Sequence, residues 1–300
     1  MTSGCRNCGS SNVRDLGSVG RVAPFFLKRV LGAELRVANC SNRLKQLIRD
    51  LATASRVSRL TAQSVYIEMQ FCRDCSFIQT KIPFRDDDIM RLYQDYRSSS
   101  YNRERIYFEP AYGKIADFVG HDEVEVQNRI EATTRFLRDK VVMKQPFSIL
   151  DYGGADGRFI PDLVGSKFVY DVSTIEPVPG VSRVHSESQL VSYSLVLLAH
   201  VTEHVPFPLE LVRKVSEYVR PSGYLYLENP KEISDKDIDQ LASGGGAFEI
   251  GVHEHINQYS VSAVRRLLEV AGFRVIAVEC VPLECGWSTQ LVIRALGRKE

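Results

Sequence analysis

The segment that constrains the fold most strongly is Ile149-Leu-Asp151-Tyr-Gly153-Gly154-Ala-Asp156-Gly157-Arg-Phe-Ile160. Its apolar start predicts a strand, and the glycines predict a turn that leads into a helix. Glycine adopts backbone angles closed to other residues, and it lets a ligand come close to the main chain. In a doubly wound sheet such a turn lies at the carboxyl end of the first strand, where nucleotide-like ligands bind. Taken alone, the segment is compatible with a ligand loop or with a purely structural turn.

An acidic residue follows this turn at a suitable distance. Asp171 ends the next apolar run, 20 positions after Asp151. A carboxylate at the tip of the second strand can accept hydrogen bonds from both hydroxyls of a ribose. The alternatives are a simple turn residue, or Glu176 in the same role if residues 174–177 form the strand end.

The second half of the chain alternates short apolar runs with segments of helix length. Strands are expected at residues 148–151, 167–171, 194–199 and 224–228, after a lead-in helix within 122–140. Such alternation predicts crossover connections and a parallel sheet. A helix is expected over 261–271, with Ser260 as N-cap and Gly272 just past its end. Strands at 273–279 and 289–295 then pair antiparallel, because the connection is too short for a crossover helix.

These motifs, in this order, resemble the class I S-adenosylmethionine-dependent methyltransferases. The acidic and glycine residues of 151–157 match their first motif, His200-Val-Thr-Glu203-His204 matches a segment after their fourth strand, and Pro221-Ser-Gly223 matches the turn into their fifth. Tyr193-Ser194 stands where many relatives have an acidic residue. A dinucleotide dehydrogenase would explain the glycines, but not the final antiparallel pair.

The resemblance implies an α/β fold with a Rossmann-like sheet, mostly parallel and with its last strand antiparallel. It also implies S-adenosyl-L-methionine as the cofactor. The residues expected to bind this cofactor are Asp151, Gly153, Gly154, Gly157, Asp171, Ala199 and His200.

Four of the six histidines fall in two groups that could supply a general base. An unperturbed imidazole titrates near neutral pH, which suits removal of a proton from a hydroxyl or carbon acceptor. His200 and His204 form one group, and His253 and His255 form the other. The segment 200–204 could alternatively hold a metal ion, but it offers no third ligand at metal spacing.

The segment His253-Glu254-His255 resembles the His-Glu-His stretch of zinc-containing sugar C-methyltransferases from deoxysugar pathways. By this resemblance His255 is the expected base and Glu254 an active-site group, and His253 and His200 complete the expected catalytic set. The alternative is that these side chains only line a polar loop before the helix at 261–271.

The same resemblance concerns the acceptor. It implies a carbohydrate acceptor, such as a sugar, a nucleotide sugar or a glycan of polysaccharide biosynthesis. Tyrosines before residue 102 resemble residues that shape the pocket in those enzymes, although they could equally be interfacial aromatics. The expected acceptor-binding residues are Tyr93, Tyr96, Tyr101, His204 and Asn257.

Two Cys-x-x-Cys pairs predict a structural zinc site. Cys5 with Cys8, and Cys72 with Cys75, have the spacing that directs two thiolates at one tetrahedral ion. The long separation of the pairs means that the ion would fasten the N-terminus to a distant strand. A redox pair is the alternative. Cys40, Cys280 and Cys285 stand alone and are expected to be buried thiols.

Three regions are expected, namely a zinc-binding region at 1–82, a helical and tyrosine-rich lead-in at 83–140, and a cofactor-binding domain at 141–300. A formal charge of +1 gives no electrostatic support for binding nucleic acid. No apolar run is long enough for a membrane span, and no leader pattern opens the chain. We therefore expect a cytoplasmic enzyme with a small-molecule or glycan acceptor. The alternatives are a methyltransferase that acts on a non-carbohydrate small molecule, and a zinc-containing scaffold that has lost catalytic activity.

Overall fold

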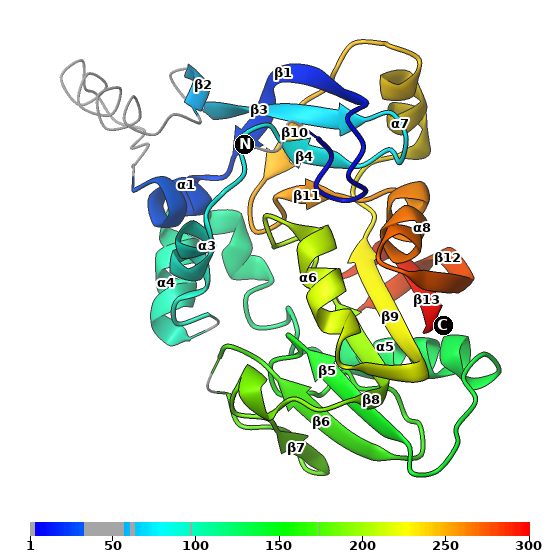
Figure 1. Cartoon of the computed structure of the whole chain (residues 1–300). Coiled ribbons are helices and arrows are strands. Elements are labelled where there is room, and N and C mark those ends of the chain that lie inside the picture. Colours follow the sequence, from blue (N-terminus) through cyan, green and yellow to red (C-terminus); the bar gives the residue numbers. More distant parts are fainter. Residues whose placement is uncertain (1–3, 33–56, 61–63, 97, 174) are drawn as a thin grey trace. The chain divides into compact units, whose positions relative to one another are not determined.

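A computed structural model describes residues 4–32, 57–60, 64–96, 98–173 and 175–300. The chain divides into two compact units, each with its own sheet and its own apolar core (Figure 1). Unit 1 comprises residues 1–116, 203–206 and 233–258, and unit 2 comprises 117–202, 207–232 and 259–300. The boundaries expected at 82 and 140 divide the chain into three consecutive segments. Each of these units is instead assembled from three separate segments.

The sheet of unit 2 confirms the predicted doubly wound arrangement. Its strand order is β12 (Phe273–Cys285), β13 (Ser288–Lys299), β9 (Val219–Pro230), β8 (Tyr193–Ala199), β5 (Ser148–Tyr152), β6 (Ser166–Tyr170) and β7 (Val181–Arg183). β5 pairs parallel with β6 and β8, and β8 pairs parallel with β9. β13 pairs antiparallel with β9 and β12, as expected for the last strand.

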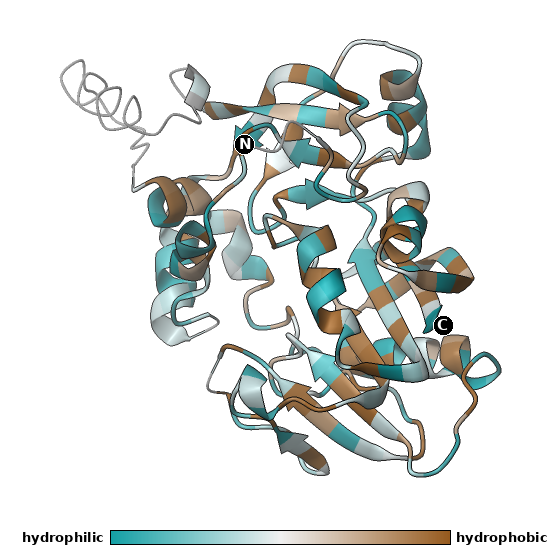
Figure 2. Ribbon diagram, viewed as in Figure 1, coloured by the Kyte–Doolittle hydropathy of each residue, from teal (hydrophilic) through white to brown (hydrophobic). Residues whose placement is uncertain are grey.

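Burial explains why the central strands are continuously apolar. The first six residues of β8 are buried, and both faces of a parallel sheet are covered when helices form its crossovers. The helix α6 (Pro208–Ser216), by contrast, buries one stripe that includes Leu209, Val212 and Val215. Figure 2 shows brown and teal alternating along α6, as this pattern requires.

The helices of unit 2 begin and end at residues that the sequence marks. Asp122 caps α5 (Glu123–Arg138) by accepting a hydrogen bond from the backbone of Glu125. Ser260 caps α8 (Val261–Val270) through the backbone N–H of Ala263. Gly272 follows α8 with φ of +91°, a left-handed conformation that glycine adopts without strain. The lead-in helix and the last helix are thus confirmed.

One expectation at the glycine segment is wrong, because no helix follows it. The residues between Tyr152 and Ser166 form turns. Pro161 removes a backbone donor from this stretch, and Gly157 and Gly165 both have positive φ. The short connection therefore crosses from β5 to β6 without regular structure.

Unit 1 is built on a sheet that combines both ends of its sequence. The order is β10 (Ile250–Val252), β1 (Val13–Val22), β3 (Val65–Cys72), β4 (Ile78–Thr80) and β11 (Asn257–Gln258), and β2 (Val57–Leu60) pairs with β3. β10 runs parallel to β1, and β11 runs antiparallel to β4. The segment 250–258 therefore provides two strands to the sheet of the N-terminal region.

The described helices of unit 1 are α1 (Pro24–Leu31), α3 (Asp86–Tyr93), α4 (Ser99–Phe108), the 3-10 turn η1 (Pro110–Lys114) and α7 (Asp235–Ala242). α1 packs on α3 and α4 and buries Phe25, Phe26 and Leu27. The sequence from Arg21 to Arg59 is basic and has a mostly helical pattern, and α1 is the helix found in its described part. Residues 57–59 instead lie in β2, and 33–56 fall outside the described residues.

The cysteines outside the pairs behave differently from one another. Cys285 is buried as expected, and burial raises the pKa of its thiol to about 11. Cys280 is exposed, so the expectation of a buried thiol is wrong there. It lies in β12, which pairs on one side with β13. Cys40 lies outside the described residues.

Within the part of the chain that the structure describes, no helix has both the length and the apolar character needed to cross a bilayer.

Candidate functional site

The turn after β5 has the backbone conformation that requires its glycines. Gly153 and Gly157 have φ of +79° and +75°. A Cβ added at Gly154 would lie 2.1 Å from the carboxylate of Asp151. A side chain at any of these three positions would therefore strain the loop or collide with it.

Asp171 is tied directly to this loop. It follows the last residue of β6, and its Oδ2 accepts a hydrogen bond of 2.9 Å from the backbone N–H of Ala155. Its Oδ1 accepts a second from Ser173 at 2.7 Å. Each carboxylate oxygen can accept two hydrogen bonds, so capacity remains for two ribose hydroxyls. The alternative residue Glu176 is exposed and lies outside any strand.

Asp151 has a different environment from Asp171. It is 2% exposed, and burial raises the pKa of its carboxyl to about 7, although the nearby Arg129 acts in the opposite direction. The side chain lies against Gly154, beneath the loop. Asp151 thus supports the shape of the glycine turn.

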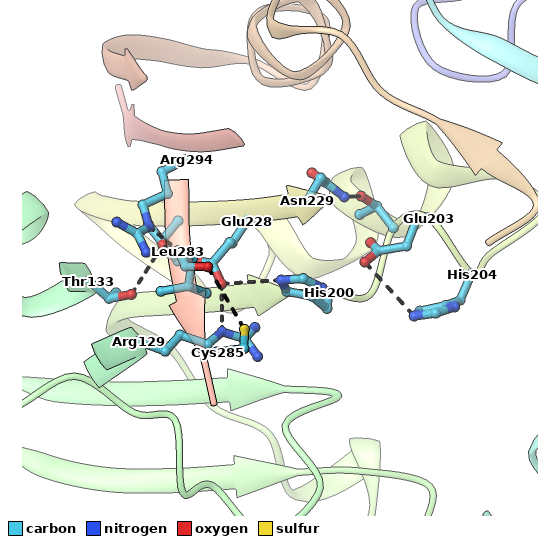
Figure 3. Close-up of polar contacts among 12 residues, drawn as sticks. Arg129, Thr133, His200, Glu203, His204, Glu228, Asn229, Leu283, Cys285 and Arg294 are labelled. Carbon is cyan, nitrogen blue, oxygen red and sulfur yellow. Dashed lines mark hydrogen bonds and ion pairs between the residues drawn. The ribbon is translucent and has the colours of Figure 1, made fainter. Parts of the chain in front are cut away.

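His200 follows β8 and adjoins a buried carboxylate. Its backbone N–H donates to the carbonyl of Glu228 at 2.8 Å, and its Nε2 lies 3.4 Å from Oε1 of Glu228. Figure 3 shows its ring directed at Glu228. Its φ of +55° turns the chain sharply at the end of the strand.

Glu228 is the centre of an ion-pair cluster that the sequence did not reveal. It is fully buried and accepts hydrogen bonds from Arg129 Nε at 2.6 Å, Arg294 Nε at 2.9 Å and the Tyr226 hydroxyl at 2.6 Å (Figure 3). Burial alone would raise the pKa of Glu228, but the two guanidinium groups and His200 hold it well below its ordinary range. In the sequence, the available sign of this cluster was that Glu228 is the single acidic residue in the apolar run of β9.

We predict that Glu228→Gln destabilises the protein by about 3–5 kcal/mol, because two buried guanidinium groups lose their counter-charge. Urea unfolding followed by circular dichroism measures this change. Glu217→Gln, at an exposed position, is the matched control and should change stability by less than about 0.5 kcal/mol. Equal stability of the two variants would contradict the role given to the cluster.

In unit 1, the loop 253–255 connects β10 to β11 and is held by residues 203–206. The backbone N–H groups of Ile256 and Asn257 donate to the carbonyl of Glu203 at 3.0 and 3.2 Å. The side-chain amide of Asn257, which is buried, donates to the carbonyl of Val205 at 2.7 Å. Two of the predicted segments, about fifty residues apart, are thus brought together.

Glu254 is fixed by two residues of α4. Tyr101 and Arg105 stand four positions apart and so share one face of the helix. The Tyr101 hydroxyl donates to Oε1 of Glu254 at 2.8 Å, and Arg105 forms an ion pair with the same oxygen. Burial would raise the pKa of Glu254, but Arg105 and His204 lower it below its ordinary value. Glu254 is therefore an ionised, positioned carboxylate.

The environment of His204 defines its tautomer. Its Nδ1 lies 3.0 Å from the carbonyl oxygen of Glu254 and 2.6 Å from the Tyr93 hydroxyl. A carbonyl can only accept, so we assign the ring hydrogen to Nδ1. Burial lowers the pKa of His204 to about 4, and the ring is neutral at pH 7. Its Nε2 then carries a lone pair, 3.9 Å from Oε1 of Glu203.

The histidines and tyrosines of unit 1 form one cluster. The ring of His255 lies 4.8 Å from that of His204 and 4.6 Å from that of His253, measured between centroids. Tyr96 contacts both Tyr93 and Tyr101 edge to face. Ligand atoms of Glu203, His204 and His255 lie within 4.8 Å of one another. Segment 200–204 offered no third ligand at metal spacing. In the fold, His255 of the loop 253–255 lies close enough to Glu203 and His204 to complete such a group.

The four paired cysteines also converge. Cys5 and Cys75 are 3.7 Å apart between Sγ atoms, as are Cys8 and Cys72, and all four atoms lie within 4.8 Å of one another. The edge of a ZnS₄ tetrahedron with bonds near 2.3 Å is about 3.8 Å. The cluster thus has the spacing of a four-thiolate site for one ion.

Comparison with known proteins identifies the family. A family model described as a methyltransferase domain matches residues 123–278, just over half of the chain. The chain belongs to this methyltransferase family. With the glycine loop, the acidic residue and the strand order described above, the protein is a class I S-adenosylmethionine-dependent methyltransferase.

Several solved structures are similar to this methyltransferase. One is the 1,6-didemethyltoxoflavin-N1-methyltransferase of Burkholderia thailandensis, solved with 1,6-didemethyltoxoflavin and S-adenosylhomocysteine. It is 16% identical with a TM-score of 0.44, over 65% of this chain and 86% of the other. An S-adenosylmethionine-dependent methyltransferase of Aquifex aeolicus is 19% identical with a TM-score of 0.40, over 60% and 95% of the chains. One from Leishmania major is 16% identical with a TM-score of 0.42, over 59% and 75%. No curated protein sequence matches the methyltransferase.

Proposed function

We propose that this methyltransferase methylates a sugar, a nucleotide sugar or a glycan at a hydroxyl or carbon atom. The observation that carries the proposal is the cluster of unit 1, in which histidines, tyrosines and an ionised glutamate gather around the loop 253–255. Partly buried hydroxyl, imidazole and carboxylate groups are suited to an acceptor rich in hydroxyls, because each can form a directed hydrogen bond.

The cofactor belongs to the loop of unit 2. We assign its adenosine part to the glycine turn and to Asp171, whose oxygens retain capacity for two hydroxyls. Asp151, Gly153, Gly154, Gly157, Ala199 and His200 complete this proposed site. When bound, S-adenosylmethionine supplies a methyl group on a sulfonium, ready for in-line displacement. The protein's tasks are then to align the acceptor, exclude water and accept its proton.

We assign removal of the acceptor's proton to the histidines of unit 1. His255 is the residue on which turnover depends most, as the expected base. Glu254 is held by Arg105 and Tyr101, and it fixes His204 through its backbone carbonyl. Glu254 therefore positions the group, while the tyrosine hydroxyls orient the acceptor.

We also propose that the four cysteines hold one structural zinc ion. A closed set of four sulfurs leaves no position open for a substrate, which is typical of structural sites. Cys72 ends β3, and Cys5 and Cys8 lie in the turn that precedes β1. The ion would therefore tie the two strands at their ends.

We predict that Asp171→Asn weakens binding of S-adenosylhomocysteine by about 10- to 100-fold, equal to about 1.4–2.8 kcal/mol. An amide accepts at only one of its two terminal atoms, so one ribose hydroxyl loses its partner. Isothermal titration measures the change. Glu176→Gln is the matched control and should bind as the wild type does. Equal weakening in the control would refute the choice of Asp171.

We predict at least one zinc per chain by elemental mass spectrometry, and one fewer in Cys72→Ser. Loss of the ion should lower the thermal stability of unit 1, because metal binding contributes folding free energy. Cys280→Ser, at an exposed thiol in unit 2, serves as control and should keep its zinc. Protein purified without chelators that holds no zinc would contradict the assignment.

We predict that the enzyme methylates nucleotide sugars or oligosaccharides. The screen compares these compounds with hydroxylated and heteroaromatic acceptors that contain no sugar. Transfer of a radiolabelled methyl group should appear only with carbohydrates.

His255→Ala should lower turnover by about 10²- to 10⁴-fold while still binding S-adenosylhomocysteine. His185→Ala, at an exposed histidine, is the control. Turnover only with sugar-free acceptors overturns the acceptor class, and full activity of His255→Ala overturns the role of His255.

A further inference from the structure

We propose that Glu203, His204 and His255 bind one divalent first-row transition metal ion, separate from the four-cysteine site. Nothing in the sequence joins the three residues, since two come from the segment after β8 and the third from the loop before β11. The fold brings one ligand atom of each within 4.8 Å of the others. Two imidazole nitrogens and one carboxylate oxygen are a donor set that such ions prefer.

The hydrogen bonds of His204 prepare it as a ligand. Histidines that bind metals usually donate their other ring N–H to a backbone carbonyl or carboxylate, which fixes the tautomer. His204 has this arrangement, because Nδ1 lies 3.0 Å from the carbonyl of Glu254 and Nε2 points to Glu203 (Figure 3). The Tyr93 hydroxyl at 2.6 Å further restricts the ring.

The pair of His204 and Glu203 also presents two acceptor atoms to each other. With its hydrogen on Nδ1, the ring presents a lone pair at Nε2 to a carboxylate oxygen 3.9 Å away. A cation between two such acceptors is attracted to both. Nitrogen and oxygen ligands on a tetrahedral zinc ion lie about 3.3 Å apart, so a small movement of the side chains closes the site.

The remaining coordination positions would be open to the acceptor. Three protein ligands are typical of catalytic metal sites, in contrast to the closed four-sulfur set. An ion here changes the deprotonation step proposed above, because His255 as a ligand cannot also accept the proton, and in this respect the inference rests on the proposed function. The ion would lower the pKa of a coordinated acceptor hydroxyl. The hydroxyl proton would pass to His253, whose ring is 4.6 Å from that of His255. The alkoxide oxygen would attack the methyl carbon as the bond from that carbon to the sulfonium sulfur breaks, which releases S-adenosylhomocysteine.

The test is a titration of zinc-loaded, full-length protein with Co²⁺, without cofactor or acceptor. We expect one Co²⁺ per chain beyond the zinc, with the visible absorption of nitrogen and oxygen ligation and no thiolate charge-transfer band. Glu203→Gln, His204→Ala and His255→Ala should each bind this ion at least about tenfold more weakly. His253→Ala and His185→Ala are matched histidine controls and should bind it with unchanged affinity.

Retained zinc and an unchanged circular dichroism spectrum show that each variant is folded. The inference is overturned if the wild type takes up no additional Co²⁺, if a thiolate band shows that Co²⁺ has only replaced zinc, or if His255→Ala binds as the wild type does. Loss of binding in His253→Ala would equally overturn the ligand set. Because binding is measured without turnover, failure of the carbohydrate screen leaves this result intact, and the reverse also holds.

Discussion

The pairing of residues 250–258 with the N-terminal sheet is the constraint on which the histidine and tyrosine cluster of unit 1 depends. β10 pairs with β1, and β11 pairs with β4, so both ends of the short loop 253–255 are held by strands from the first eighty residues. A loop anchored at both ends loses little further entropy when it binds a ligand. The carbonyl of Glu203 then receives two backbone donors from the end of that loop, which fixes segment 203–206 against it.

Glu254, His204 and Tyr93 of this cluster are each oriented by a neighbour on another element. Arg105 and Tyr101 of α4 hold Glu254, whose carbonyl orients His204, and Tyr93 at the end of α3 meets the same ring. Groups that are already oriented need little reorganisation when charge develops on an acceptor. The Glu228 cluster in unit 2 follows the same rule with stronger charges, because two arginines and a tyrosine surround one carboxylate.

Local patterns in the sequence predicted the sheet and the capped helices of unit 2 well. Strand-length apolar runs, the glycine turn and Asp171 are close in sequence to the structures that they form, and the caps at Asp122 and Ser260 act within one turn. Contacts over long separations were beyond such reasoning. Glu228 gave a hint as the one acidic residue in β9, but its partners Arg129 and Arg294 lie 99 and 66 residues away. The prediction of a helix after Gly157 was wrong, because that connection is short and contains Pro161.

The discontinuous make-up of unit 1 has a consequence for biosynthesis. Its sheet receives β10 and β11 from residues 250–258, so β1 and β4 each lack one partner strand until that segment has left the ribosome. Exposed strand edges favour pairing with other chains. During translation, the nascent N-terminal region is therefore the part of the protein most in need of chaperone protection.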